Sequence, residues 1–423
     1  GPLAIAMPAS RGSRTTNRIR HGLADVARAH DPTARVESAC REGQMSLLDY
    51  RPAVASRWRQ QDWILTGAAI TLAFLGTLLV WSATRPRMIT LGLDPQNYLK
   101  KHLLTLIIAF ALGWATSRLN YPLLRAYAPI VYGLSILGLI AVLLIGTRVN
   151  GIRAWISLPA GFTLQPAEFT KIAVVIIISF MLGELRDPSR GPSVREVLQV
   201  FALVGVPLAL IMLQPDLGTA LVISVTMMGV LAIGGAARGW FIAILAGVVL
   251  VGGIAISVPG VLKSYQRDRL TVFIDPTVDP AGAGYNLNQV RIAIGSGGWT
   301  GTGLFNGPQT NGRFVPEQQT DFIYSVAGEE LGFLGSGLIV VLLGLIVWRA
   351  LRISGRAPDT FGRLAAAGIA SWIGFQAFEN IGMSLGIMPM TGVPLPFVSY
   401  GGSSMFALAI AIGLLQQIHF GAD

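Results

Sequence analysis

Charged residues are scarce in this chain and make up only 13% of its 423 residues. Soluble globular proteins usually carry about 25%, so the composition argues against a soluble globular fold. Cysteine occurs once, as Cys40, which excludes an internal disulfide. The four histidines form no cluster with zinc-ligand spacing and supply no Ser-His-Asp set. The sequence therefore argues against a zinc enzyme and against a hydrolase with a Ser-His-Asp triad.

Other familiar features are also missing. Residues 1–59 lack the apolar core, about 7–15 residues long, of a secretory signal peptide. No segment repeats with a period of about 20–50 residues. The glycine-rich stretch 295–303 lacks both a preceding strand and the Gly-Lys-Ser/Thr ending of a phosphate loop. We therefore reject a nucleotide-binding fold.

Apolar residues, by contrast, are abundant. They make up 52% of the chain, the mean hydropathy is +0.58, and they gather into long runs. A helix needs about 20 apolar residues to cross the hydrocarbon core. The runs predict an all-α, polytopic integral membrane protein with about ten transmembrane helices, at about 62–83, 102–118, 126–146, 169–185, 197–213, 217–235, 239–259, 321–348, 364–386 and 403–419.

The basic residues suggest an orientation. The net charge is +10, and most Lys and Arg fall in residues 1–60 and in the loops on one side of the expected membrane. No basic and aromatic platform for nucleic acid is visible, so anionic lipid headgroups are the favoured counter-ions. The bias predicts both termini in the cytoplasm. Residues 1–60 then form a disordered basic cytoplasmic tail, and 61–420 a membrane domain with an ordered extracytoplasmic loop, 260–320, between helices 7 and 8.

Ionisable groups at membrane depth are costly, which makes them functional candidates. Glu168 and Lys171 are spaced i, i+3 and share a helix face. They form either a local ion pair or the polar lining of a cavity in which Lys171 faces an anionic ligand. Asp216, in Gln214-Pro215-Asp216, either caps the next helix or belongs to a functional site; the two roles are compatible.

Three polar stretches lie near the large loop. Asp321 stands where the loop meets an apolar span, and its partly desolvated carboxylate suits a general base; the alternative is an N-cap. Pro and Gly break the helical pattern over 379–404, either to line a wet cavity or as a purely structural break. The further substrate-binding candidates in these stretches are Arg267, Arg269, Tyr285, Gln289, Glu317, Thr320, Asn380, Ser399 and Tyr400.

Several long motifs occur in one order: QPAEFTK, QPDLGTA, DPAGAGYNLNQ, PEQQTDFIYSVAGEELG and PMTGVPLPFVSYGGSS. Together, over about residues 60–420, they resemble the SEDS family (shape, elongation, division, sporulation). The PLPF form is similar to the RodA elongation branch rather than the FtsW division branch. One departure is Gln319, where the family commonly has His, which argues against a proton relay at that position.

The resemblance implies a ten-span peptidoglycan glycosyltransferase of the bacterial cytoplasmic membrane that polymerises lipid II during elongation. Asp321 matches the essential loop aspartate, Glu168 and Lys171 the polar pair of the fourth span, and Asp216 the QPD aspartate. Arg153 falls in the first conserved outer loop, where the family often has Gln or Ala.

The implied partners are lipid II, the undecaprenyl-pyrophosphate-linked glycan, a class B penicillin-binding protein that supplies the transpeptidase, and other membrane proteins of the elongation complex.

In the expected mechanism Asp321 acts as general base in an inverting transfer. Lys171, Arg267 and Arg269 are the candidates for stabilising the departing pyrophosphate. We also expect a divalent cation, Mg²⁺ or Mn²⁺, with Asp321 as a possible ligand. The alternative function is a lipid II flippase, which broken spans and buried charges would also fit.

Overall fold

The computed structural model describes residues 60–119, 121–149, 152–157, 162–184, 191–257, 273 and 282–421. The predicted tail, with Cys40, lies outside the described residues. So do Arg267, Arg269 and most of the first part of the large loop. The predictions made for those segments stay predictions.

Each of the ten predicted spans coincides with a helix, although some ends differ. The first helix continues to Thr90 and the eighth to Arg356, each several residues beyond its predicted end. The helices are α4 (Trp63–Thr90), α5 (Asn97–Arg118), α7 (Ala128–Ile145), α8 (Pro166–Glu184), α9 (Val194–Leu213), α10 (Leu217–Ile233), α11 (Arg238–Ser257), α15 (Ile323–Arg356), α16 (Thr360–Leu385) and α17 (Gly402–Phe420).

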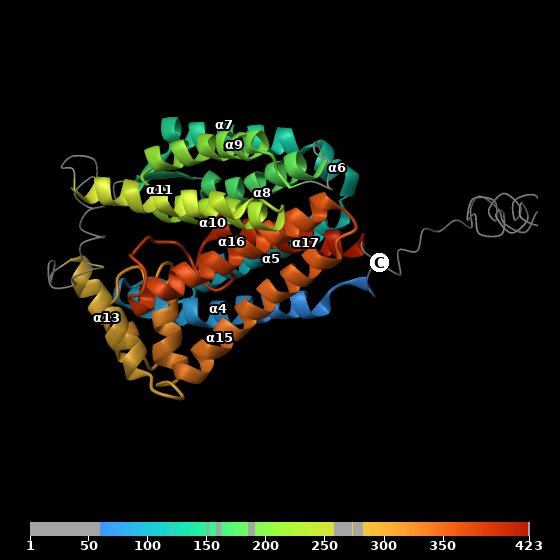
Figure 1. Cartoon of the computed structure of the whole chain (residues 1–423). Helices are drawn as coiled ribbons and strands as arrows, with labels where there is room; N and C mark the ends of the chain where they lie inside the picture. Colours follow the sequence, from blue (N-terminus) through green and yellow to red (C-terminus); the bar gives the residue numbers. More distant parts are fainter. Residues whose placement is uncertain are drawn as a thin grey trace, which may run out of the picture. The chain divides into compact units, whose positions relative to one another are not determined.

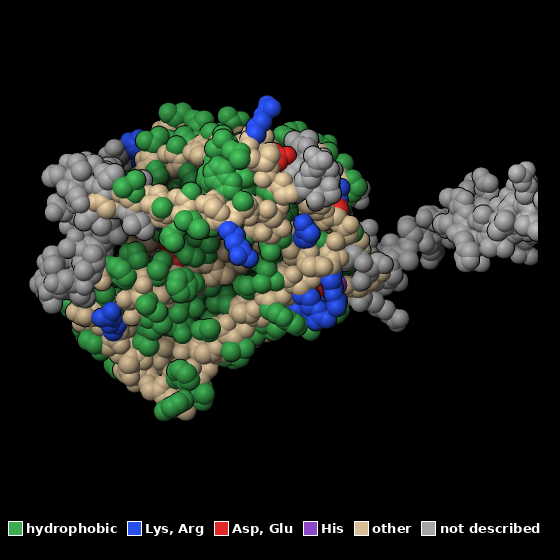
Figure 2. Space-filling view, in the orientation of Figure 1, with side chains coloured by type: hydrophobic (Ala, Val, Ile, Leu, Met, Phe, Trp, Pro, Cys, Tyr) green, Lys and Arg blue, Asp and Glu red, His purple; other side chains and the backbone are tan. Residues whose placement is uncertain are grey.

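Within the described ranges, seven of these helices are long and apolar enough to cross a membrane: α4, α5, α7, α8, α9, α15 and α17. The outer surface of the helical bundle is also suited to contact with lipid. Figure 2 shows hydrophobic side chains over most of the visible flank and few acidic ones. Leu144 is 74% exposed and Val341 is 66% exposed, which would be costly in water and suits contact with lipid. The protein is therefore a helical, multi-pass membrane protein, and the count of ten crossings stays a prediction.

Short polar side chains fix where several helices begin. Asp62 accepts a hydrogen bond from the Leu65 backbone N–H at the start of α4, and Asp359 accepts one from Gly362 N–H at the start of α16. Ser193 and Glu196 form a reciprocal capping box on α9. These bonds satisfy backbone donors that the helices themselves leave unpaired.

Helix α8 lies deepest in the bundle. Every residue from Thr170 to Ser179 is buried, and the helix contacts α7, α9, α10, α16 and α17. A membrane helix with neighbours on all sides can hold polar groups without exposing them to lipid. This position accounts for the presence of Glu168 and Lys171 in a span.

A small antiparallel sheet precedes α8, and the all-α prediction did not include it. It consists of β1 (Thr147–Val149), β2 (Ile152–Ser157) and β3 (Thr163–Leu164), in the order β1-β2-β3. Arg148 pairs with Arg153, and Ile156 with Leu164. The strands have only two to six residues, too few for a clear alternating pattern in the sequence.

The described part of the large loop includes two helices joined by turns. It contains α13 (Ala283–Ser296) and α14 (Pro308–Gly312). Figure 1 shows α13 at the end of the bundle opposite to the chain's C-terminus. Helix α15 is kinked at Gly332, whose φ of 66° is left-handed. A Cβ there would lie 2.3 Å from Gly301 N, so the glycine lets the loop approach the helix closely.

Candidate functional site

Asp321 is half-buried and lies just before the start of α15. The N-cap residue of α15 is Phe322, so the capping alternative for Asp321 is not supported. Asn380 of α16 donates a hydrogen bond to the Asp321 backbone carbonyl at 2.8 Å. A methyl group on Gly392 would lie 3.2 Å from Asp321 Oδ2. Two segments distant in the sequence thus lie beside Asp321, one at its backbone and one near its carboxylate.

A tight turn leads into Asp321. The Glu317 carbonyl accepts hydrogen bonds from the backbone N–H groups of Thr320 and Asp321, both at 3.1 Å, and from the Thr320 hydroxyl at 3.2 Å. Glu317 itself has a left-handed φ of 49° and an exposed side chain. The turn therefore presents the Glu317 side chain outward and fixes the backbone before the candidate base.

The broken segment after α16 is ordered by its own polar groups. Ser399 Oγ accepts a hydrogen bond from Leu395 N–H at 2.8 Å. Tyr400 N–H donates to the Gln319 carbonyl at 2.9 Å, which connects this segment to the turn before Asp321. The Tyr400 ring packs against Tyr98, with centroids 5.2 Å apart. Ser399 and Tyr400 thus hold the segment in place beside the turn.

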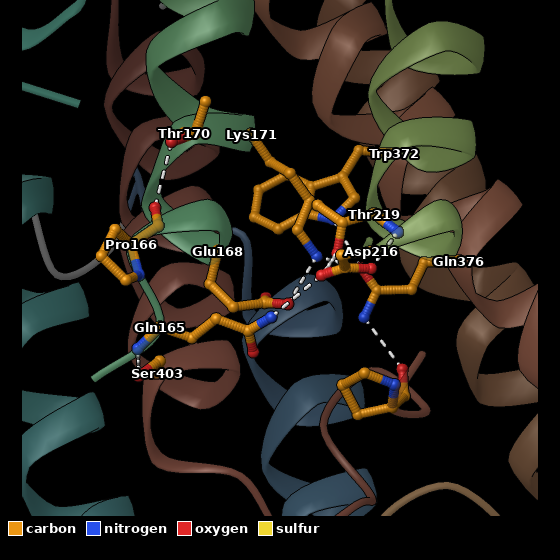
Figure 3. A network of polar contacts seen from close by, with 11 residues as sticks. Gln165, Pro166, Glu168, Thr170, Lys171, Asp216, Thr219, Trp372, Gln376 and Ser403 are labelled. Atoms are coloured by element: carbon orange, nitrogen blue, oxygen red, sulfur yellow. Dashed lines mark hydrogen bonds and ion pairs between the residues drawn. The ribbon is translucent and has the colours of Figure 1, made fainter. Parts of the chain in front are cut away.

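Glu168 and Lys171 form a buried ion pair, with Lys171 Nζ 2.9 Å from Glu168 Oε1. Lys171 also donates to Gln376 Oε1 of α16 at 2.8 Å, and its ammonium lies over the Trp372 ring. Figure 3 shows these side chains converging between the helices. Neither charged residue is more than 1% exposed. The geometry therefore supports the ion-pair alternative, and Lys171 presents no free surface to an anion in this conformation.

Asp216 is the N-cap residue of α10. Its carboxylate accepts from the Thr219 N–H at 3.0 Å, the Thr219 hydroxyl at 2.8 Å and Gln165 Nε2 at 3.1 Å (Figure 3). Burial raises the pKa of Asp216, and the two bonds from Thr219 oppose that rise. The capping role is thus supported, and the bond from Gln165 joins this turn to the start of α8.

Glu329 and Glu330, near the start of α15, bind the large loop and α4 respectively. The Glu329 carboxylate accepts from the backbone N–H groups of Gln309 and Thr310, at 2.6 and 2.9 Å, and from the Thr310 hydroxyl at 2.6 Å. Glu330 accepts from Ser82 of α4 at 2.5 Å. These two carboxylates are structural anchors.

The remaining candidates stand apart from these contacts. Arg153 is exposed on β2. Tyr285 is exposed and Gln289 half-buried, both on α13. That helix buries Val290 in a small apolar cluster with Phe322, the residue after Asp321. Tyr285 and Gln289 therefore lie on a helix that packs beside the candidate base.

The comparisons with known proteins agree with this arrangement. A family model for cell cycle proteins of the FtsW, RodA and SpoVE type matches residues 62–422. The chain belongs to this family, which is the SEDS family. It is 36% identical, over 89% of its length and 93% of the relative's, to a protein of Aeromonas salmonicida named "Probable peptidoglycan glycosyltransferase FtsW".

Two solved structures have the same fold. One, from work on polymerisation and crosslinking by a peptidoglycan synthase complex, has a TM-score of 0.70 and 30% identity, covering 85% of this chain and 98% of that one. The other is the rod shape determining protein RodA of Thermus thermophilus, with a TM-score of 0.62 and 27% identity, covering 85% and 97%. The SEDS fold therefore extends over the whole helical bundle described above.

Nothing in the described part of the chain tests the expected divalent cation directly. Across the described ranges, no three His, Cys, Asp or Glu side chains come together in a group that could hold a metal ion. Mg²⁺ usually takes one or two protein carboxylates together with substrate phosphates. Asp321 is one carboxylate of this kind, so the cation stays a prediction and we route no step through it.

Sequence analysis missed two residues at this site. Gln376 contacts Lys171, Trp372 and the Pro394 carbonyl, and Gly392 stands beside the Asp321 carboxylate. A signal for Gln376 was present, because it precedes Asn380 by four residues and therefore shares its helix face. Nothing in the sequence distinguished Gly392 from the other glycines of the broken segment.

Proposed function

We propose that this chain is a peptidoglycan glycosyltransferase that polymerises lipid II into glycan strands at the outer face of the bacterial cytoplasmic membrane. The proposal is supported by SEDS membership and by the glycosyltransferase name of its relative. The observation that carries it is half-buried Asp321, whose backbone is bonded by α16 and whose carboxylate lies near Gly392 just before α15. A carboxylate that is partly but not fully buried suits proton abstraction from a substrate hydroxyl.

In the proposed reaction, Asp321 takes the proton from the 4-hydroxyl of the acceptor GlcNAc. The hydroxyl oxygen forms a bond to the anomeric carbon of the donor MurNAc, and the bond to undecaprenyl pyrophosphate breaks. The leaving group carries the developing negative charge, which needs cationic stabilisation. Because Lys171 is buried and paired with Glu168, this role falls to Arg267 and Arg269 in the proposal.

The partner and the pathway belong to the same proposal. One similar structure comes from a peptidoglycan synthase complex that polymerises and crosslinks, which supports a class B penicillin-binding protein as partner. The PLPF segment and the likeness to RodA favour elongation, whereas the sequence relative is named FtsW and favours division. Expression in bacterial cells depleted of their elongation SEDS protein, and in cells depleted of their division SEDS protein, separates the two. We expect the chain to restore rod shape. Restored division without restored rod shape would assign the chain to the division branch.

The orientation also stays within the proposal, with both termini in the cytoplasm and α13 outside. Single cysteines at exposed Ser296 and at exposed Arg356, in a Cys40→Ser background, test it with a membrane-impermeant thiol reagent. Labelling of intact spheroplasts at position 296 and not at 356 is expected. Labelling at position 356 and not at 296 would show that the chain has the opposite orientation in the membrane.

The test of the activity uses purified protein in detergent with lipid II as the sole substrate. A polymerase forms glycan strands there, because the reaction requires no intact bilayer. A flippase, which moves lipid II between leaflets, forms no polymer under these conditions. Glycan product from the purified chain supports the proposal, and a folded chain that forms no product would favour the flippase alternative.

A further inference from the structure

Gln376 and Asn380 lie one turn apart on α16, and both are fully buried. Each donates its side-chain amide to the same short stretch of the broken segment. Asn380 Nδ2 bonds to the Val393 carbonyl at 2.7 Å, and Gln376 Nε2 bonds to the Pro394 carbonyl at 2.9 Å. Two consecutive carbonyls next to Gly392 are therefore fixed by one helix face.

The other contacts of these two amides lead in opposite directions. Asn380 Nδ2 also donates to the Asp321 carbonyl at 2.8 Å. Gln376 Oε1 accepts from Lys171 Nζ at 2.8 Å and from Trp372 Nε1 at 2.7 Å (Figure 3). Hydrogen bonds through Gln376 thus connect the buried ion pair of α8 to Pro394. The peptide bond from Pro394 to Val393 continues the connection, and Asn380 extends it from Val393 to the backbone of Asp321.

The orientation of the Gln376 amide is set by its neighbours. Its oxygen faces two donors, Lys171 and Trp372, and its nitrogen faces a carbonyl acceptor. Rotating the amide by 180° would place donors against donors and leave the carbonyl without its bond. Among the natural side chains of this size, only glutamine supplies an acceptor and a permanent donor at these two positions.

We propose that Gln376 is a positioning residue, which places the Gly392–Pro394 stretch against Asp321 by fixing it to the Lys171–Glu168 ion pair. This inference rests on the proposed role of Asp321 as general base. Because a methyl group on Gly392 would already lie 3.2 Å from Asp321 Oδ2, a small shift of the stretch changes the space in front of the carboxylate. A misplacement of about 1 Å can cost about a hundredfold in rate.

Two variants and one matched control test this inference in the full-length protein. Gln376→Met removes all three hydrogen bonds, and Gln376→Glu keeps the acceptor for Lys171 but loses the donor to Pro394. The control is Gln416→Met: Gln416 is 2% exposed and also makes three hydrogen bonds, to Asp62 and Thr66, at the other end of the bundle. Its loss therefore imposes a comparable burial cost away from Asp321.

The first measurement is amide hydrogen exchange of peptides covering 393–400, which include the Tyr400 N–H bonded to the Gln319 carbonyl. The second is the steady-state rate of lipid II polymerisation. We expect both Gln376 variants to speed exchange in this stretch and to lower kcat by about tenfold or more, with KM changed by less than about threefold. Gln416→Met should leave both quantities near the wild-type values.

Exchange in the Gln376 variants that equals the wild type would overturn the positioning role. So would faster exchange with unchanged kcat, or an equal fall in kcat for Gln416→Met. The exchange measurement needs no catalysis, so it separates this inference from the proposed function. Wild-type polymerisation by Asp321→Asn would refute the general base while leaving the exchange result intact. If Gln376→Met does not fold, Gln376→Glu still carries the test, because it loses one bond of three.

Discussion

Asn380 Nδ2 lies 2.8 Å from the backbone carbonyl of Asp321, although the two residues are 59 positions apart. The same nitrogen also donates to Val393, so one buried amide joins the candidate base to the broken segment. Helix α16 therefore sets the position of the Asp321 backbone. This relationship gives Asn380 a contact that positions Asp321, and its expected role in substrate binding stays a prediction.

Replacing Asn380 with leucine should lower the rate of polymerisation without abolishing folding. The substitution leaves the carbonyls of Asp321 and Val393 without their donor, and each unsatisfied buried group costs about 1–3 kcal/mol. We expect a lower thermal unfolding midpoint and a kcat reduced by about tenfold or more. A variant with normal kcat would show that this amide does not position Asp321.

Gly392→Ala tests the proximity of the broken segment to the carboxylate. Gly392 has a φ of 77°, and Gly92 has a similar φ of 68° but no atom within 4 Å of its expected Cβ. Alanine at either position should cost about 1 kcal/mol through backbone strain. Only Gly392→Ala should lower polymerase activity, since its methyl group meets Asp321. Equal activity loss in both variants would assign the effect to strain alone.

The buried ion pair should behave as a unit in a double-mutant cycle. Lys171→Met leaves Glu168 buried without its partner and should destabilise the protein by about 3–5 kcal/mol. The double variant Lys171→Met/Glu168→Gln removes both charges and should recover a substantial part of that loss. Unfolding midpoints in detergent compare wild type with Lys171→Met, Glu168→Gln and the double variant. Strictly additive effects would contradict a direct pairing.

Glu329 should control the order of the loop around α14. Glu329→Ala removes the acceptor for Gln309 and Thr310, and we expect faster hydrogen exchange across residues 302–312. Glu317→Ala is the control, because its side chain is exposed. If the exchange of this segment is equal in both variants, Glu329 does not anchor the loop.

The membrane fold was largely predictable because long apolar runs are a strong and local signal. Each of the ten predicted segments is a helix within the described residues. Local spacing also predicted that Glu168 and Lys171 share a face. The sheet at 147–164 escaped prediction because its strands are too short to show a period. Exact helix ends were off where polar turns continue a helix, as at Thr90.

The contacts that build the site were not predictable in the same way. Lys171 and Gln376 are 205 positions apart, and no local pattern pairs them. The sequence identified the polar residues because charge in a span is costly, but only the packing of α8 against α16 shows which of them meet. That packing buries Glu168, whereas Glu317 lies exposed in the turn before α15.

The rate of lipid II polymerisation by Asp321→Asn, beside wild type and Asp94→Asn, tests the central claim most directly. The amide matches the carboxylate in size but cannot accept the proton, so the account predicts a loss of about a hundredfold or more. Asp94→Asn changes an exposed acid whose ion pair with Lys100 also lies at the surface, and this variant should keep nearly full activity. Wild-type polymerisation by a folded Asp321→Asn protein would contradict the assignment of Asp321 as the general base.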